Sequence, residues 1–362
     1  MAPTSDLKRA SVIAFDRLDS LTDPDALSKL LGPIANVRRE PLAGSSSGFS
    51  NSRHEILHVE RPDGAVLRLR LKRTHIGEDW IARLMRDVPP GREVSLLAEP
   101  RLAAAWDAFV RPHRAYAVEG NQAGLLMDDY EGLLLPDVRE PIALATEDRL
   151  LGAIADLHAR FWESEALSLP WLMRPEWYAD VLGPHQAGDE AALRGAPQSI
   201  RDGVREGWSD AGKALPAEVL ARLSLPAERV WRDWADLPRT LLHGDTKVAN
   251  FAFLPDGRVA AFDWTNLGAA PATLEIGWYL AVNGTRLARS KDDLILRYRE
   301  LLMSRLGRAL DPALWDRMMD AAVFTGARML LWSKALGLRE GTPHRREDWA
   351  WWVERLTRWC AR

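Results

Sequence analysis

Within residues 241–264 the sequence gathers five polar side chains that could act together on a phosphate. These are His243, Asp245, Lys247, Asn250 and Asp263. Magnesium prefers hard oxygen ligands and is commonly bound through one or two carboxylates together with the phosphates of a substrate. Asn250 and Asp263 can supply such oxygens. Asp245 can then accept the proton of a hydroxyl group, and Lys247 can contact a phosphate. Phosphoryl transfer needs this set of groups, because it depends mainly on positioning and charge stabilisation.

A predicted β-hairpin brings two of these residues together. Asp256-Gly257 lies between two short apolar runs, and this pair is a strong signal for a hairpin turn. With this pair as a two-residue turn, Asn250 is expected to face Asp263 across the ladder, roughly 4.5–5.5 Å away. An ordinary hairpin with polar ends is the simpler interpretation of the Asp-Gly pair alone. The ordered set of polar residues around it favours a functional site.

The His-Gly-Asp triplet at 243–245, followed by Asn250 and then Asp263 in a Phe-Asp-Trp triplet, resembles the aminoglycoside phosphotransferase and choline kinase-like family. Members of that family are similar to protein kinases. The resemblance implies that Asp245 is the catalytic base and that Asn250 and Asp263 hold Mg2+. Lys247 differs from the histidine that is common in the family. It resembles the lysine of protein-kinase catalytic loops, which implies a catalytic role beside Asp245.

Length and composition describe an ordinary globular protein. The chain has 362 residues, of which 47% are hydrophobic and 27% charged, and this length is more compatible with two lobes than with one. The net charge of −3 provides no basic footprint for nucleic acid. No apolar run approaches the roughly 20 residues that span a bilayer, so no membrane partner is expected.

The single cysteine, Cys360, cannot form an internal disulfide, and no signal peptide is recognisable, so a cytoplasmic location is expected. Nothing in the sequence indicates an oligomeric state.

A loop of small residues at 44–51 precedes an alternating apolar run. It contains Gly44, Ser46, Ser47 and Gly48. Small residues let backbone N–H groups approach phosphate oxygens, although the loop is neither a Walker A sequence nor a complete Gly-x-Gly-x-x-Gly motif. A flexible serine-rich turn is the alternative interpretation. The resemblance to the family's phosphate-covering loop favours nucleotide binding by these four residues.

A predicted strand at 66–72 carries basic side chains on one face and leucines on the other. By resemblance to the family, Lys72 at the end of this strand contacts the nucleotide phosphates and pairs with a glutamate of the next helix. Arg70 shares the face and is an alternative, as is a solvated basic face without a function. Glu93 is the predicted partner because it matches the family's arrangement best. Glu78 is the other candidate, and an exposed surface acid is the alternative interpretation of either.

The stretch at 125–130, which contains Met127, Asp128 and Asp129, resembles the hinge between the lobes of the family, where backbone groups bind the adenine edge. The hinge divides the chain into a predicted N-terminal lobe, residues 1–126, and a predicted C-terminal lobe, residues 127–362. Asp128, Asp129 and Glu131, together with the many tryptophans, also permit a cationic acceptor.

The C-terminal lobe is predicted to be mainly helical. Apolar residues recur at helical spacing from 150 to 161, and His158 falls on their face, where a core histidine is favoured over a ligand. Glu275 stands where the family usually has an aspartate that anchors the catalytic loop, and its longer side chain leaves that role open. Further helices are expected at about 292–306, 312–337 and 346–360.

Together these features predict an α+β, bilobal, protein kinase-like fold, with an antiparallel sheet in a small N-terminal lobe and a larger, mainly helical C-terminal lobe. The expected activity is transfer of the γ-phosphoryl group of ATP to a hydroxyl of a small molecule, with Mg2+ as the second cofactor. The acceptor is not determined. A non-catalytic, kinase-like nucleotide-binding or regulatory protein is one alternative. A metal-dependent hydrolase is another, which requires further His or Asp ligand clusters.

Overall fold

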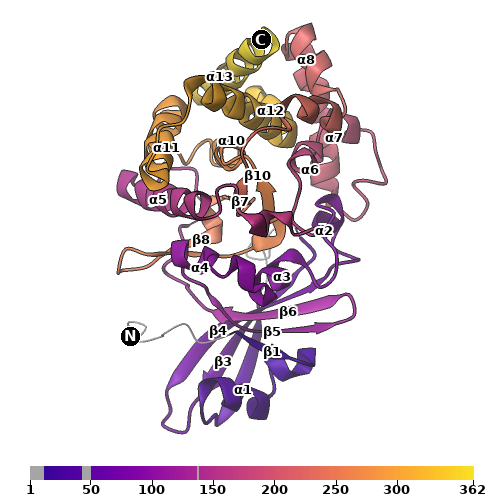
Figure 1. Ribbon diagram of the computed structural model, residues 1–362. Coiled ribbons are helices and arrows are strands. Elements are labelled where there is room, and N and C mark those ends of the chain that lie inside the picture. Colours follow the sequence, from indigo (N-terminus) through magenta and orange to yellow (C-terminus); the bar gives the residue numbers. More distant parts are fainter. Residues whose placement is uncertain (1–11, 43–49, 137) are drawn as a thin grey trace.

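The computed structural model describes residues 12–42, 50–136 and 138–362, and has a sheet at one end and a larger helical part at the other (Figure 1). The N-terminal part is a six-stranded sheet of order β1-β5-β6-β4-β3-β2. Its neighbouring strands are antiparallel except β1 and β5, which are parallel. The predicted α+β, bilobal fold class is confirmed. The strands are β1 (Ile13–Phe15), β2 (Asn36–Pro41), β3 (Arg53–Glu60), β4 (Val66–His75), β5 (His113–Glu119) and β6 (Gln122–Asp128).

Short helices cover the two faces of this sheet. Leu69 and Leu71 of β4 are fully buried under the first helical segments, in a cluster with Leu27 of α1. The opposite face packs against α3, where Val94 contacts Met127 of β6. Alternation along β4 therefore buries the leucines on one face, as predicted, and leaves the other face to the basic residues. The helices of this part are α1 (Pro24–Leu31), α2 (Trp80–Leu84), α3 (Arg92–Ala98) and α4 (Ala105–Ala108).

The rest of the chain is mainly helical, and its long helices lie close to the predicted ranges. The last helix buries Trp349, Trp352 and Trp359 along one stripe. Within the described residues, no helix combines the length and apolar character that crossing a membrane requires. The helices are α5 (Leu144–Arg160), α6 (Pro175–Asp180), α7 (Gln198–Ala214), α8 (Ala217–Leu223), α9 (Ala227–Trp231), α10 (Thr273–Val282), α11 (Lys291–Leu306), α12 (Pro312–Gly337) and α13 (Pro343–Cys360).

Four short strands lie between the sheet and the helices, where the ribbon shows β7, β8 and β10 (Figure 1). They form two antiparallel pairs, β7 with β10 and β8 with β9. The loop between β7 and β8 carries the polar triplet at 243–245, and β9 ends just before Asp263. The pairs are β7 (Thr240–Leu242) with β10 (Gly268–Ala270), and β8 (Phe251–Phe253) with β9 (Val259–Ala261).

Helix α10 lies directly behind this loop and packs closely on α12. Gly277 of α10 makes the close approach possible, because a Cβ atom there would lie 2.3 Å from the backbone oxygen of Ala322. Gly326 of α12 faces it, since its own Cβ atom would lie 2.7 Å from the oxygen of Gly277. The two helices therefore touch through backbone, which fixes the position of α10.

We expect Gly277→Ala to lower the free energy of unfolding by about 1–3 kcal/mol, because an added methyl group forces packed backbone apart. Gly152→Ala in α5 is the matched control, since a Cβ atom there meets no heavy atom within 4 Å. That change should leave stability unchanged or raise it by up to about 1 kcal/mol, the helix-propensity difference. Urea denaturation of both variants measures the effect. Equal stability of the two variants would contradict the close packing of α10 on α12.

Candidate functional site

The predicted lysine of β4 forms a buried ion pair with α3, the second helix after this strand. The Nζ atom of Lys72 lies 2.7 Å from Oε2 of Glu93, the second residue of α3, and the side chains are 8% and 4% exposed. Glu78, the alternative partner, is 76% exposed and lies 3.9 Å from His75. The structure thus pairs Lys72 with Glu93, while a nucleotide-binding role for the pair remains a prediction.

The other carboxylate oxygen of Glu93 connects this pair to the rest of the site. Its Oε1 atom accepts a hydrogen bond from the backbone N–H of Asp263 at 3.1 Å and lies 3.1 Å from Nε2 of His113. Burial alone raises the pKa of Glu93, but the charge of Lys72 and the hydrogen bond with His113 lower it well below its ordinary value. Glu93 is therefore ionised and joins α3, β4 and β5 to the segment after β9. The sequence did not single out His113, because a lone histidine at a strand end carries no motif.

Asp263 lies two residues after the end of β9 and has a left-handed backbone conformation, with φ 59° and ψ 62°. Non-glycine residues adopt such conformations rarely, at a cost of order 1–3 kcal/mol, and they cluster at functional sites. The Oδ1 atom lies 2.8 Å from Nζ of Lys72 and accepts a hydrogen bond from the hydroxyl of Thr265 at 3.1 Å. Burial alone lowers the pKa of Lys72, but the charges of Asp263 and Glu93 outweigh it and raise this pKa above its ordinary value. One lysine thus holds two carboxylates from different parts of the chain.

The predicted register of the central hairpin is wrong by one residue. Phe251 of β8 pairs with Ala261 of β9. One step further along the ladder, the N–H of Phe262 donates to the carbonyl of Asn250 at 2.9 Å. Asn250 therefore faces Phe262 and not Asp263.

The length of the hairpin loop explains this shift. The N–H of Leu254 donates to the carbonyl of Arg258 at 2.9 Å, so three residues, not two, form the connection. The last of them, Gly257, has a φ of 91°. Three-residue hairpin loops commonly end in such a left-handed residue, which forms a bulge. The Asp-Gly pair is compatible with both loop lengths, and only the backbone distinguishes them.

Asp245 is held from two sides. Its Oδ2 atom accepts a hydrogen bond from Nδ2 of Asn250 at 3.0 Å, and its Oδ1 atom accepts one from the indole Nε1 of Trp278 at 2.8 Å. The pKa of Asp245 is raised, mainly by burial and then by the negative charge of Asp263, against the lowering effect of its hydrogen bonds. A raised pKa brings a carboxylate closer to the range in which a general base is efficient. Asp245, Asn250 and Asp263 thus belong to one site, although Asn250 contacts the first of these carboxylates and not the second.

The oxygen atoms beside Asp245 fit the ligand preference of Mg2+. The amide nitrogen of Asn250 donates to the carbonyl and to the carboxylate of Asp245, each at 3.0 Å, so the amide oxygen is directed to the other side. Asp263 adds a carboxylate that is 42% exposed. An amide oxygen and a carboxylate are hard ligands of the kind that Mg2+ accepts. The two residues therefore have suitable chemistry for Mg2+, and metal binding by them remains a prediction.

The hydrolase alternative requires a different kind of cluster. Among the described residues, no group of three or more His, Cys, Asp or Glu side chains is arranged to hold a metal ion.

Helix α10 anchors the loop at 243–248. The carboxylate of Glu275 accepts hydrogen bonds from the backbone N–H of His243 at 2.7 Å and of Gly244 at 2.9 Å. Glu275 therefore binds the loop, although its side chain is longer than the aspartate that is usual at this position in the family that the motif resembles. His158 is fully buried, and its Nε2 atom lies 3.4 Å from Oε2 of Glu275. It is part of the support of the loop, which agrees with its interpretation as a core residue.

Comparison with solved structures returns choline kinases and aminoglycoside phosphotransferases among other enzymes. Choline kinase LicA from Streptococcus pneumoniae matches 92% of this chain and 96% of its own at 11% identity, with a TM-score of 0.45. Choline kinase from Cryptosporidium parvum Iowa II matches 94% of each chain at 9% identity, with a TM-score of 0.49. An aminoglycoside phosphotransferase from Alicyclobacillus acidocaldarius matches 91% of each chain at 16% identity, with a TM-score of 0.40.

The chain is similar in structure to choline kinases and aminoglycoside phosphotransferases. These are the two groups of enzymes that the sequence motif resembles. No protein-family model and no curated protein matches the sequence. At these identities and TM-scores the similarity assigns no substrate to this chain, and the residues of the site carry the functional conclusion.

The sequence predicts two further phosphate contacts, one by Lys247 and one by the loop of small residues. Lys247 is half-buried and precedes the short turn Val248–Asn250, and it forms no ion pair with any described residue. Its contact with a phosphate remains a prediction. The other contact involves the loop residues Gly44, Ser46, Ser47 and Gly48, which lie outside the described residues.

The acids of the predicted hinge are already paired. The carboxylate of Asp128 lies 2.5 Å from Nε of Arg114, and its backbone N–H donates to the carbonyl of Pro112 at 2.9 Å. The carboxylate of Asp129 lies 3.0 Å from Nε of Arg68. These two acids are therefore not a free negative surface for a cationic acceptor. Met127 is buried in the cluster under α3 and lies in register with Arg70 of β4 and His113 of β5, so binding of a nucleotide by this residue remains a prediction.

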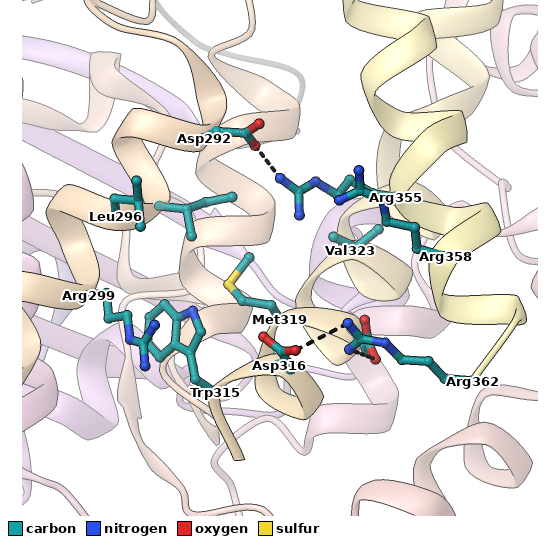
Figure 2. Close-up of a pocket in the computed structure, with 12 residues that line it drawn as sticks. Asp292, Leu296, Arg299, Trp315, Asp316, Met319, Val323, Arg355, Arg358 and Arg362 are labelled. Atoms are coloured by element: carbon teal, nitrogen blue, oxygen red, sulfur yellow. Dashed lines mark hydrogen bonds and ion pairs between the residues drawn. The ribbon is translucent and has the colours of Figure 1, made fainter. Parts of the chain in front are cut away.

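A cavity of about 290 Å³ lies elsewhere in the helical part, between α11, α12 and α13 (Figure 2). The dashed lines show two ion pairs at this cavity, Arg355 with Asp292 and Arg362 with Asp316. All four residues line the cavity. None of the predicted site residues lines this cavity. It is therefore separate from the site around Asp245.

Proposed function

We propose that this protein transfers the γ-phosphoryl group of ATP to a hydroxyl group of a small molecule in a Mg2+-dependent reaction. The observation that carries the proposal is the meeting of Lys72, Glu93 and Asp263 beside the held carboxylate of Asp245. An ammonium group, a carboxylate base and oxygen ligands for a cation are the groups that phosphoryl transfer requires.

Each group then has a defined task. The acceptor's hydroxyl oxygen bonds to the γ-phosphorus while the bond to the β-phosphate oxygen breaks, and Asp245 takes the hydroxyl proton. Asn250 and Asp263 hold Mg2+, which neutralises phosphate charge when it is bound. Lys72 has three N–H donors, of which two are directed to Glu93 and Asp263. The third is available for a phosphate oxygen.

Release of ADP tests the proposal. Purified protein is incubated with ATP and a panel of amine-bearing and neutral alcohols, with Mg2+ or with excess EDTA. We expect ADP release that depends on one class of acceptor and on Mg2+. Binding of ATP without ADP release under any condition would replace this proposal with a non-catalytic nucleotide-binding protein.

Asp263→Asn should weaken the Mg2+-dependent binding of ATP by about 100-fold or more. Loss of a residue that only hydrogen-bonds to a metal ligand already costs about 10- to 100-fold in metal affinity, and Asp263 is proposed to bind the metal directly. The variant removes the carboxylate assigned to the cation and keeps the size of the side chain. Isothermal titration calorimetry with and without Mg2+ measures the effect. Asp256→Asn is the matched control, because Asp256 lies at the tip of the same hairpin and, within the described part of the chain, pairs with Arg258 alone. An Asp263→Asn titration that matches wild type would remove the metal role.

A further inference from the structure

Three residues of α10 and its C-terminal end hold the loop that carries Asp245. Glu275 binds the backbone N–H groups of His243 and Gly244. At the other end, Asn283 accepts a hydrogen bond from the N–H of Val248 at 3.0 Å and donates one to the carbonyl of Thr246 at 2.9 Å. The side chains of both residues bind main-chain groups of the loop. The carboxylate of the proposed base is held by a third residue between them.

We propose that this third residue, Trp278, is a positioning residue for Asp245 in the phosphoryl transfer proposed above. Its indole Nε1 donates to Oδ1 of Asp245 at 2.8 Å, while Asn250 donates to Oδ2. The terminal torsion of an aspartate is broad in the absence of such contacts. One donor on each oxygen fixes the plane of the carboxylate, so that its remaining lone pairs keep one direction.

The chemistry of an indole suits this task. The N–H group of tryptophan is a donor only, and it has no acceptor atom that could take the proton from the hydroxyl group. Trp278 can therefore orient the base without competing with it. No sequence motif indicates this contact, because Trp278 lies 33 residues along the chain from Asp245.

The helix that carries Trp278 is rigidly placed. The preceding residue, Gly277, touches the backbone of Ala322 in α12, and Glu275 one turn earlier is buried against the loop. One turn of α10 thus provides a contact to α12, an anchor for the main chain of the loop and a donor for the carboxylate. Positioning of this kind matters because a misplacement of about 1 Å can cost 10²-fold in rate.

Trp278→Phe keeps an aromatic ring and removes the N–H group. We expect kcat to fall by about 10- to 100-fold, the value of a hydrogen bond to a charged group, while KM for ATP stays near that of wild type. Trp351→Phe is the matched control. It removes an indole N–H that donates to Oδ1 of Asp292 at 2.9 Å, between α13 and α11. That variant should keep the wild-type kcat.

The outcomes separate this inference from the proposed function. A wild-type kcat in Trp278→Phe, or a parallel loss of ATP affinity and thermal stability, overturns the positioning role and leaves the proposed reaction intact. Absence of ADP release by the wild-type enzyme overturns both.

The contact itself has an independent readout in the ¹H–¹⁵N indole resonances, where the peak lost in Trp278→Phe identifies Trp278. That peak should move in Asp245→Ala, and an unmoved peak overturns the inference.

Discussion

Asp245→Asn should reduce phosphoryl transfer by about 10²- to 10⁴-fold, the usual loss when a general base is removed. The amide has nearly the shape of the carboxylate, but it cannot take a proton from a hydroxyl group. Burial and the charge of Asp263 raise the pKa of Asp245 in the native protein. The neutral amide relieves this repulsion but loses one of the two hydrogen bonds from Asn250 and Trp278, because its NH2 group cannot accept. The fold and the binding of ATP with Mg2+ should both survive the substitution.

The test separates binding from chemistry. ADP release with the best acceptor gives kcat, and calorimetric titration with ATP and Mg2+ gives the affinity for the nucleotide. Asp256→Asn controls for the loss of an acid from the same hairpin region without contact with the base. An Asp245→Asn enzyme that turns over as fast as wild type would exclude this residue as the base.

Local patterns were sufficient to predict the elements and part of the site. Alternation in β4 correctly separated the buried leucines from the face of Lys72, because the side chains of a strand point alternately to opposite sides. The partner Glu93 was also identified, because it matches the arrangement of the family that the motif resembles. The alternation depends on residues that are adjacent in the sequence, and the choice of Glu93 depends on the resemblance.

The contacts that the sequence did not predict depend on backbone detail or on distant segments. Asn250 faces Phe262 and not Asp263 because the hairpin loop has three residues and ends in Gly257 with a positive φ, whereas the Asp256-Gly257 pair permits either loop length. The contact of Trp278 with Asp245 depends on where α12 places α10. No periodicity within α10 or within the loop that carries Asp245 predicts the distance between these two residues. The residues that touch the proposed base were therefore recognised in part, and their geometry only from the structure.

Lys72→Met should lower the free energy of unfolding by about 3–5 kcal/mol, because breaking a buried ion pair leaves an uncompensated charge inside the protein. The charge left behind is that of Glu93, whose side chain is 4% exposed. The partly exposed Asp263 loses the same partner but can be solvated. Urea denaturation gives the stability, and the variant should also lose affinity for ATP, since a donor to phosphate is gone.

The double variant Lys72→Met with Glu93→Gln identifies which of these losses is electrostatic. Glutamine still offers an oxygen to the N–H of Asp263 and to His113, as Oε1 of Glu93 does, but it carries no charge. Replacing a buried ion pair by neutral groups of similar volume is often neutral for stability, so most of the stability lost in Lys72→Met should return. The affinity for ATP should not return, because methionine cannot donate to a phosphate.

A double variant as unstable as Lys72→Met would show that packing around the lysine, and not the buried carboxylate, determines the loss of stability. Recovery of both properties would mean that Lys72 contributes to the fold alone and has no direct contact with the nucleotide.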